Sequence, residues 1–270
     1  VVGGGRVHTA WALRAAGGDA AIVAGRLLDD VVGERGVVIR GRADSGDVSG
    51  VLEQQTVASL DSPPVRLLVE QMLVESDNTT AELLVKEMGR TATERGTTVR
   101  GLSLLLDALD AAGHPINGVV PHDGSGLDPD NRLTCSLLAS VLDDQHLGST
   151  LVDSLPVAGG RGTMKKRFVG TAGEGRVRAK TGTLRGVTSL AGVVDTPAGR
   201  RLAFALVSNG ELPYEIRDLH EDLVLSLLPY PAGPGADLLS PLPVVDPPVP
   251  QPSGGCRWGR SRGSLARSRA

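Results

Sequence analysis

The sequence predicts an α/β (α+β) fold, in which an antiparallel sheet is flanked by helices and an all-helical lobe accompanies it. The first observation behind this prediction is the apolar spacing of three and four residues within segments 62–112 and 134–142, which is typical of core-facing helices. The second is a change to alternating apolar residues over 177–208, where short turns separate three runs, as in an antiparallel meander. At 270 residues the chain is long enough to bury a sizeable core.

The N-terminal third carries weaker signals. A first helix is expected over Asp19–Leu28, where apolar residues recur at helical spacing. A short strand is expected at Val37–Ile39, and a polar, Gly-containing connection is expected over 41–56.

Two clearer helices meet at a short junction. The first is expected to follow Ser62 as its N-cap, with a proline in its first turn and an apolar stripe from Val65 to Leu73. The second is expected just beyond Asn78, where Thr79-Thr80-Ala81-Glu82 matches a capping box. The triplet Ser76-Asp77-Asn78 therefore falls in the tight connection between the two helices.

The remaining elements follow in order. A helix is expected over Thr98–Ala112, and Thr134 is expected to cap another helix that runs through Leu142. The three strands of the meander are Val177–Thr183, Val187–Asp195 and Arg201–Ser208. A final helix carries Ile216, Leu219, Leu223 and Leu227.

Composition divides the chain into three parts. Residues 1–18 form an N-terminal segment that matches no element, 19–228 form the folded part, and 229–270 form a Pro-rich, then Arg/Gly/Ser-rich tail that is expected to be disordered. No basic and apolar leader opens this chain at Val1, so no signal peptide is expected in it. No apolar run approaches the length of a transmembrane segment.

Charge and composition exclude several function classes. A net charge of −3 and an aromatic content of 2% argue against nucleic-acid binding. Two cysteines, Cys135 and Cys256, are too few for a disulfide scaffold. The five histidines show no metal-ligand spacing, so neither a metal nor a cofactor is expected.

Two short motifs carry candidate chemistry: Ser76-Asp77-Asn78 and Lys180-Thr181-Gly182-Thr183. Together with S-x-x-K, the S-D-N and K-T-G motifs mark β-lactamases and penicillin-binding proteins. The short loop between the two helices is expected to aim Ser76 and Asn78 into a cleft. Lys180 points away from its strand neighbours Val177 and Ala179, because successive side chains alternate across a strand.

A third segment makes the resemblance more specific. His122-Asp123-Gly124-Ser125-Gly126-Leu127, followed by Asn131-Arg132-Leu133-Thr134, resembles the D-G-S-G-L…N-R-L-T stretch of the S13 peptidase family, the class C low-molecular-mass penicillin-binding proteins. Residues 162–168 and 208–210 also resemble that family, and the likeness covers 19–228. It implies a β-lactamase/transpeptidase-like fold and a D-alanyl-D-alanine carboxypeptidase/endopeptidase. The implied partners are a peptidoglycan peptide ending in D-Ala-D-Ala and, for the complete enzyme, β-lactams; the implied location is extracytoplasmic.

The resemblance also implies roles for individual residues. Ser76 would relay a proton to the leaving nitrogen, Asn78 would orient the substrate, and Lys180 would supply positive charge. Thr181, Gly182 and Thr183 would bind substrate, with the N–H of Thr183 as an oxyanion donor. Asp123, Gly124 and Ser125 would support the site through a tight turn.

The nucleophile of the family is absent from these 270 residues. The residues three positions before Lys86, Lys165, Lys166 and Lys180 are Leu83, Gly162, Thr163 and Val177, so no S-x-x-K occurs. The chain is therefore expected to be the C-terminal part of the domain, with the N-terminal part of the fold missing, and to be inactive alone. A non-catalytic peptidoglycan-binding fragment or a degenerate paralogue remains the alternative.

Two other hydrolase types fit poorly. A class A β-lactamase should carry S-x-x-K before Ser76 and a Glu-x-x-x-Asn between the two motifs, and both are absent. His122, Asp123 and Ser125 are too close in sequence to form a Ser-His-Asp triad, and the G-x-S-x-G elbow is lacking.

Overall fold

The computed structural model describes residues 20–42, 59, 61–93, 96–144, 146–210 and 215–233. The chain divides into a unit of Val1–Pro234 and a second unit of Gly235–Ala270, and all the described residues belong to the first. The predicted segment 1–18, the connection from residue 43 onward and most of the tail lie outside the described residues. Residues 229–231 form turns.

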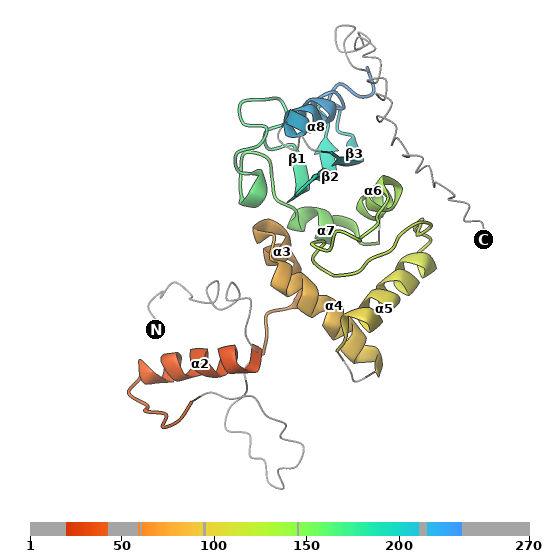
Figure 1. The fold of residues 1–270 in the computed structure, drawn as a ribbon. Helices are drawn as coiled ribbons and strands as arrows, with labels where there is room; N and C mark the ends of the chain where they lie inside the picture. Colours follow the sequence, from red (N-terminus) through yellow and green to blue (C-terminus); the bar gives the residue numbers. More distant parts are fainter. Residues whose placement is uncertain are drawn as a thin grey trace, which may run out of the picture. The chain divides into compact units, whose positions relative to one another are not determined.

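The described elements follow the predicted order (Figure 1). The helices are α2 (Ala20–Gly33), α3 (Val65–Glu75), α4 (Asn78–Thr93), α5 (Thr98–Ala111), α6 (Cys135–Asp143), α7 (Gly148–Ser154), the 3₁₀ turn η1 (Gly162–Met164) and α8 (Glu215–Leu225). The strands are β1 (Val177–Leu184), β2 (Val187–Asp195) and β3 (Arg201–Asn209). Of these, α7 and η1 were not predicted, because each is too short to show a periodic apolar pattern.

The predicted strand at Val37–Ile39 is wrong. These residues form no strand, and Val38 is 82% exposed. A strand needs a neighbour that completes its backbone hydrogen bonds, and no described strand pairs with this segment. The first helix is also longer than predicted, since α2 continues past Leu28 to Gly33.

The predicted N-cap of α3 is also wrong. Pro64, not Ser62, precedes the helix, and the hydroxyl of Ser62 donates to the carbonyl of Pro63 instead. The carbonyl of Pro64 accepts the first helical bond, from the N–H of Leu67 at 2.8 Å. The two consecutive prolines carry no N–H for a side chain to cap, so the helix starts beyond the reach of Ser62.

The start of α4 differs from the predicted capping box. Asp77 caps the helix: its Oδ1 accepts from the N–H groups of Thr79 and Thr80 at 2.9 and 3.2 Å. Thr80 adds a hydroxyl bond to Oδ2 at 3.0 Å. A carboxylate is a good N-cap acceptor, and this one lies two residues before the predicted box. Asn78 therefore belongs to the first turn of α4, and Glu82 contacts a different segment.

One other helix start follows the sequence. Thr134 Oγ1 accepts from the N–H of Leu137 at 3.1 Å and caps α6, as predicted.

In the helical part, α4 and α5 cross closely: a Cβ on Gly101 would lie 1.9 Å from the carbonyl oxygen of Val85. Only glycine fits there, so this crossing depends on one residue.

The three strands form one antiparallel sheet in the order β1-β2-β3, which confirms the predicted meander. One face of the sheet is buried against α8, and its core includes Phe168, Val177, Ala179, Leu190, Phe204 and Val224. The other face carries Lys180 and Gly182, because side chains alternate along β1. The core therefore fixes β1 from one face and leaves its second face for the candidate site.

Candidate active site

The structure brings Ser76 and Lys180 together from positions 104 residues apart. Lys180 Nζ donates to Ser76 Oγ at 2.7 Å and to the carbonyl oxygen of Thr181 at 2.8 Å. One ammonium group thus joins the α3–α4 junction to the edge of β1. The two motifs therefore contribute to one site.

The backbone, and not a long loop, holds Ser76 in place. Ser76 is the C-cap of α3 in the left-handed conformation, at φ 56° and ψ 51°, and its N–H bonds to the carbonyl of Met72. This conformation is uncommon for a residue other than glycine and costs on the order of 1 kcal/mol. Because Asp77 caps α4 at once, the chain turns within two residues. Asn78, at the first position of α4, is exposed.

Lys180 lies in a half-buried position beside the core. Its neighbour Ala179 is fully buried on the opposite face. Burial lowers the pKa of the Lys180 ammonium below its ordinary value. Among the described residues no carboxylate forms an ion pair with Lys180, so only neutral oxygens stabilise its charge.

Among the described residues, nothing pairs with the outer edge of β1 where the motif lies. The carbonyl of Val177 accepts from Ala158 at 2.9 Å, and the N–H of Ala179 donates to Pro156 at 3.0 Å. In an antiparallel strand the residues that bond outward alternate, so Thr181 and Thr183 also direct their N–H and C=O outward. No described residue pairs with that edge beyond Ala179. An extended peptide can therefore add there as a further strand.

The structure separates the side chains of the K-T-G-T motif. Lys180 and Gly182 lie on one face, and the threonine side chains lie on the other, where the side chain of Thr183 is exposed. Gly182 pairs with Ser189 of β2, and a Cβ on Gly182 would lie 2.3 Å from Ser189 Oγ. A side chain at position 182 would therefore force the Ser189 hydroxyl to rotate away. The threonines share only the strand edge with Lys180.

The carboxylate of Asp123 organises the loop that was expected to support the site. It accepts hydrogen bonds from the N–H groups of Gly126, Leu127 and Asp128, from the hydroxyl of Ser125 and from the amide of Asn131. Burial opposes ionisation of Asp123, but these hydrogen bonds outweigh it and lower its pKa. The ring of His122 bonds to neither Asp123 nor Ser125 in the described part of the chain, so no Ser-His-Asp triad forms.

Glu82 attaches this loop to α4, a role that sequence reasoning missed. Its Oε1 accepts from the N–H groups of Gly124 and Ser125, both at 2.9 Å. A Cβ on Gly124 would lie 2.9 Å from the carbonyl oxygen of Ala81, so the loop touches the helix backbone. Glu82 follows Asn78 by four residues and shares its helix face. That spacing was the only signal in the sequence.

The segment after η1 supports β1 from behind. Phe168 is buried in the core beside Val177. The buried guanidinium of Arg167 donates to the carboxylate of Glu221 on α8 and to the carbonyl of Arg217 at 3.2 Å. The N–H of Phe168 donates to the same carboxylate at 3.2 Å. One buried ion pair thus ties this segment to α8.

Among the described residues, two buried histidines lie outside the motifs. His114 joins the end of α5 to α6 through Ser140 Oγ at 2.8 Å and Asp144 Oδ2 at 3.1 Å. Ser140, His114 and Asp144 do not make a hydrolase site. Ser140 lies inside α6, where the helix already uses the backbone N–H groups, so none is available to stabilise an oxyanion. On α8, His220 bonds to Ser208 of β3 at 2.9 Å, and burial and the charge of Arg167 lower its pKa.

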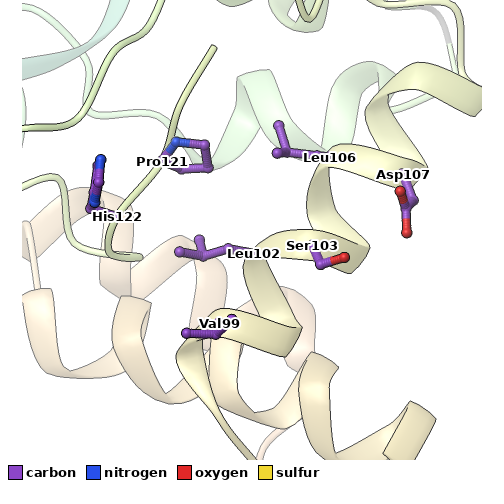
Figure 2. A pocket seen from close by; sticks show the side chains of 7 residues that line it. All are labelled: Val99, Leu102, Ser103, Leu106, Asp107, Pro121 and His122. Atoms are coloured by element: carbon purple, nitrogen blue, oxygen red, sulfur yellow. The ribbon is translucent and has the colours of Figure 1, made fainter.

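A surface pocket of about 360 Å³ lies away from these motifs (Figure 2). Val99, Leu102 and Leu106 of α5 line it together with Pro121 and His122 of the following loop. Its lining includes no residue of S-D-N or K-T-G-T.

Within the described ranges, no cluster of acidic, Cys or His side chains is suited to a metal ion. No described helix has the length and hydropathy needed to cross a membrane.

Comparison with known proteins gives the family context. The model of the D-Ala-D-Ala carboxypeptidase 3 (S13) family matches residues 5–227. The chain is 37% identical over 174 residues to Carboxypeptidase DacB of Mycolicibacterium smegmatis, covering 61% of this chain and 38% of that protein. It is 36% identical over 199 residues to a D-alanyl-D-alanine carboxypeptidase of Actinomadura sp., covering 70% and 37%. The chain thus spans a little over a third of the length of these relatives.

A solved structure shows the same fold. Penicillin-binding protein 4 (dacB) from Haemophilus influenzae, complexed with a novel β-lactam, aligns with a TM-score of 0.61 at 23% identity. The alignment covers 76% of this chain and 52% of that one. The predicted transpeptidase-like fold is confirmed.

Proposed function

Because this chain belongs to the D-Ala-D-Ala carboxypeptidase 3 (S13) family, we propose that it forms the substrate-binding and proton-relay part of a serine-type D-Ala-D-Ala carboxypeptidase or endopeptidase. Its substrate is a peptidoglycan stem peptide that ends in D-Ala-D-Ala. The observation that carries this proposal is the 2.7 Å hydrogen bond between Lys180 and Ser76 beside the open edge of β1. The substrate lies outside the cytoplasmic membrane, so the protein acts there.

The strand edge binds the peptide. The outward N–H and C=O groups of Thr181 and Thr183 pair with an extended backbone. The N–H of Thr183 then donates to the oxygen of the scissile carbonyl as negative charge develops on it. Lys180 attracts the terminal carboxylate of the peptide. The exposed amide of Asn78, at the start of α4, orients the peptide backbone. β-Lactams occupy this edge in the complete enzyme.

Ser76 and Lys180 transfer the proton that the leaving group needs. As the peptide C–N bond breaks, Ser76 Oγ–H donates to the departing nitrogen and takes a proton from Lys180 Nζ along their 2.7 Å hydrogen bond. The lowered pKa of Lys180 makes this donation less costly than from a solvated lysine. The relay therefore uses residues that this chain holds.

The attacking serine comes from outside these 270 residues. None of the four lysines follows a serine at the S-x-x-K spacing. Ser76 cannot take that role for a peptide while it serves as proton donor to the leaving nitrogen. The chain alone therefore binds substrate without turning it over, which agrees with the alternative of a non-catalytic peptidoglycan-binding fragment or degenerate paralogue.

Peptide binding tests this proposal. Isothermal titration with N-acetylated L-Lys-D-Ala-D-Ala should give saturable binding that Lys180→Ala abolishes and Lys166→Ala retains, since Lys166 is exposed. The same peptide ending in L-Ala is the stereochemical control. Equal binding by wild type and Lys180→Ala, with both variants folded, contradicts the proposal.

A further inference from the structure

We propose that Ser76 and Lys180 also form a serine nucleophile with its own lysine base, which takes up a phosphonyl or acyl group from activated electrophiles such as fluorophosphonates and aryl esters. This activity needs no S-x-x-K serine and no D-Ala-D-Ala substrate. It rests on the geometry of the pair, so it can fail while the proposed function stands.

The geometry positions the hydroxyl of Ser76 for this chemistry. Its oxygen lies 2.7 Å from Lys180 Nζ, within the range for direct proton transfer. The left-handed C-cap conformation and the Met72 bond hold the Ser76 backbone. The second bond of Lys180, to the carbonyl of Thr181, holds the amine from the strand side. Both partners are thus pre-positioned by backbone that belongs to regular elements.

Lys180 can act as a base in those molecules in which its amine is neutral, and its surroundings favour that form more than solvent does. It is half-buried, and within the described residues no carboxylate pairs with it. Burial lowers its pKa, which increases the fraction of neutral amine at a given pH. Ser140 offers the contrast: its partner His114 also bonds Asp144, but the serine lies within a helix without free N–H groups.

The open edge of β1 supplies the remaining component. The same Nζ that bonds Ser76 also bonds the outward carbonyl of Thr181, so the serine lies beside that edge. Two residues further along, Thr183 directs an N–H outward in the alternation set by Val177 and Ala179. That donor is available to an oxygen that gains negative charge as Ser76 attacks.

The step is balanced with a fluorophosphonate. Ser76 Oγ forms a bond to phosphorus, the P–F bond breaks, and fluoride leaves with its electron pair. The hydroxyl proton passes to the neutral amine of Lys180, which becomes an ammonium. Fluoride leaves as a stable anion, whereas a peptide or penicillin nitrogen must be protonated as it leaves. The pair therefore reacts with activated electrophiles and not with penicillin.

Labelling with a fluorescent fluorophosphonate tests the inference on the full chain, after its cysteines have been alkylated because Cys135 is an exposed free thiol. We expect a single labelled peptide that contains Ser76, and at least a tenfold loss of label in Ser76→Ala. Ser103→Ala, a serine of the α5 pocket outside the motifs, should label as wild type does. Urea-unfolded wild type should not label.

Lys180→Arg tests whether Lys180 acts as the base. Arginine keeps a positive charge at this position but does not act as a base near neutral pH. We expect this variant to lose at least tenfold in labelling, while binding of the D-Ala-D-Ala peptide is measured separately on the wild-type chain. Absence of label on folded wild type, or label that persists in Ser76→Ala or in folded Lys180→Arg, overturns the inference and leaves the peptide-binding proposal untouched.

Discussion

The buried ion pair between Arg167 and Glu221 gives a prediction whose size follows from the structure. The Arg167 side chain is 4% exposed and the Glu221 side chain 23%. Glu221→Ala removes the acceptor of both the guanidinium and the N–H of Phe168, and leaves the charge of Arg167 buried. Removing one partner of a buried pair costs about 3–5 kcal/mol. The partial exposure of Glu221 admits water, so we expect about 3 kcal/mol.

Urea denaturation followed by circular dichroism measures this loss. With an m-value of about 2 kcal/mol/M, a loss of about 3 kcal/mol lowers the unfolding midpoint by about 1.5 M. The double variant Arg167→Met/Glu221→Leu should regain most of the loss, because no unpaired charge is left. Glu87→Ala is the matched control: it breaks an exposed Arg–Glu pair and should leave the midpoint unchanged. A Glu221→Ala midpoint equal to that of wild type refutes the reasoning.

Three further predictions follow from the site and its support. Gly192→Ala should lower the melting temperature, at a cost of about 1–3 kcal/mol, because the new Cβ would lie 2.0 Å from the carbonyl oxygen of Arg178 on β1; Gly33→Ala, with open space around it, should not. Glu82→Ala should speed hydrogen exchange at the amides of Gly124 and Ser125, while Glu82→Gln should largely preserve their protection. NMR titration should give Lys180 a pKa below the ordinary value for lysine. Since the folded pKa is the lower one, the burial penalty on stability is full below it and disappears as pH rises toward about 10.4.

The elements that repeat a local pattern were predictable. Alternation along Arg201–Ser208 and its partners was enough to predict an antiparallel meander, and β3 extends only to Asn209. The caps at Thr134 and the run that became α5 were also local signals. The two motifs and the alternation of side chains along β1 were enough to predict that the side chains of Ser76 and Lys180 point into the same site. These predictions needed no knowledge of distant contacts.

The features that depend on distant partners were not predictable. Val37–Ile39 has the composition of a strand but no described neighbour to bond with. Glu82 matched a capping box, yet its carboxylate binds a loop more than forty residues away in sequence. Asp77 is the N-cap of α4 because its carboxylate accepts hydrogen bonds from two N–H groups of the first turn. The burial of Arg167 could not be predicted locally, because it depends on an ion pair with Glu221, which is distant in sequence.

Intact-mass spectrometry after incubation with penicillin tests the central claim most directly. The claim is that this chain holds the binding and proton-relay residues of an S13 site without its acylating serine. We predict an unchanged mass for the folded chain, whose cooperative melting is checked in parallel. A mass increase of one penicillin, mapped to any serine of the chain including Ser76, contradicts the claim.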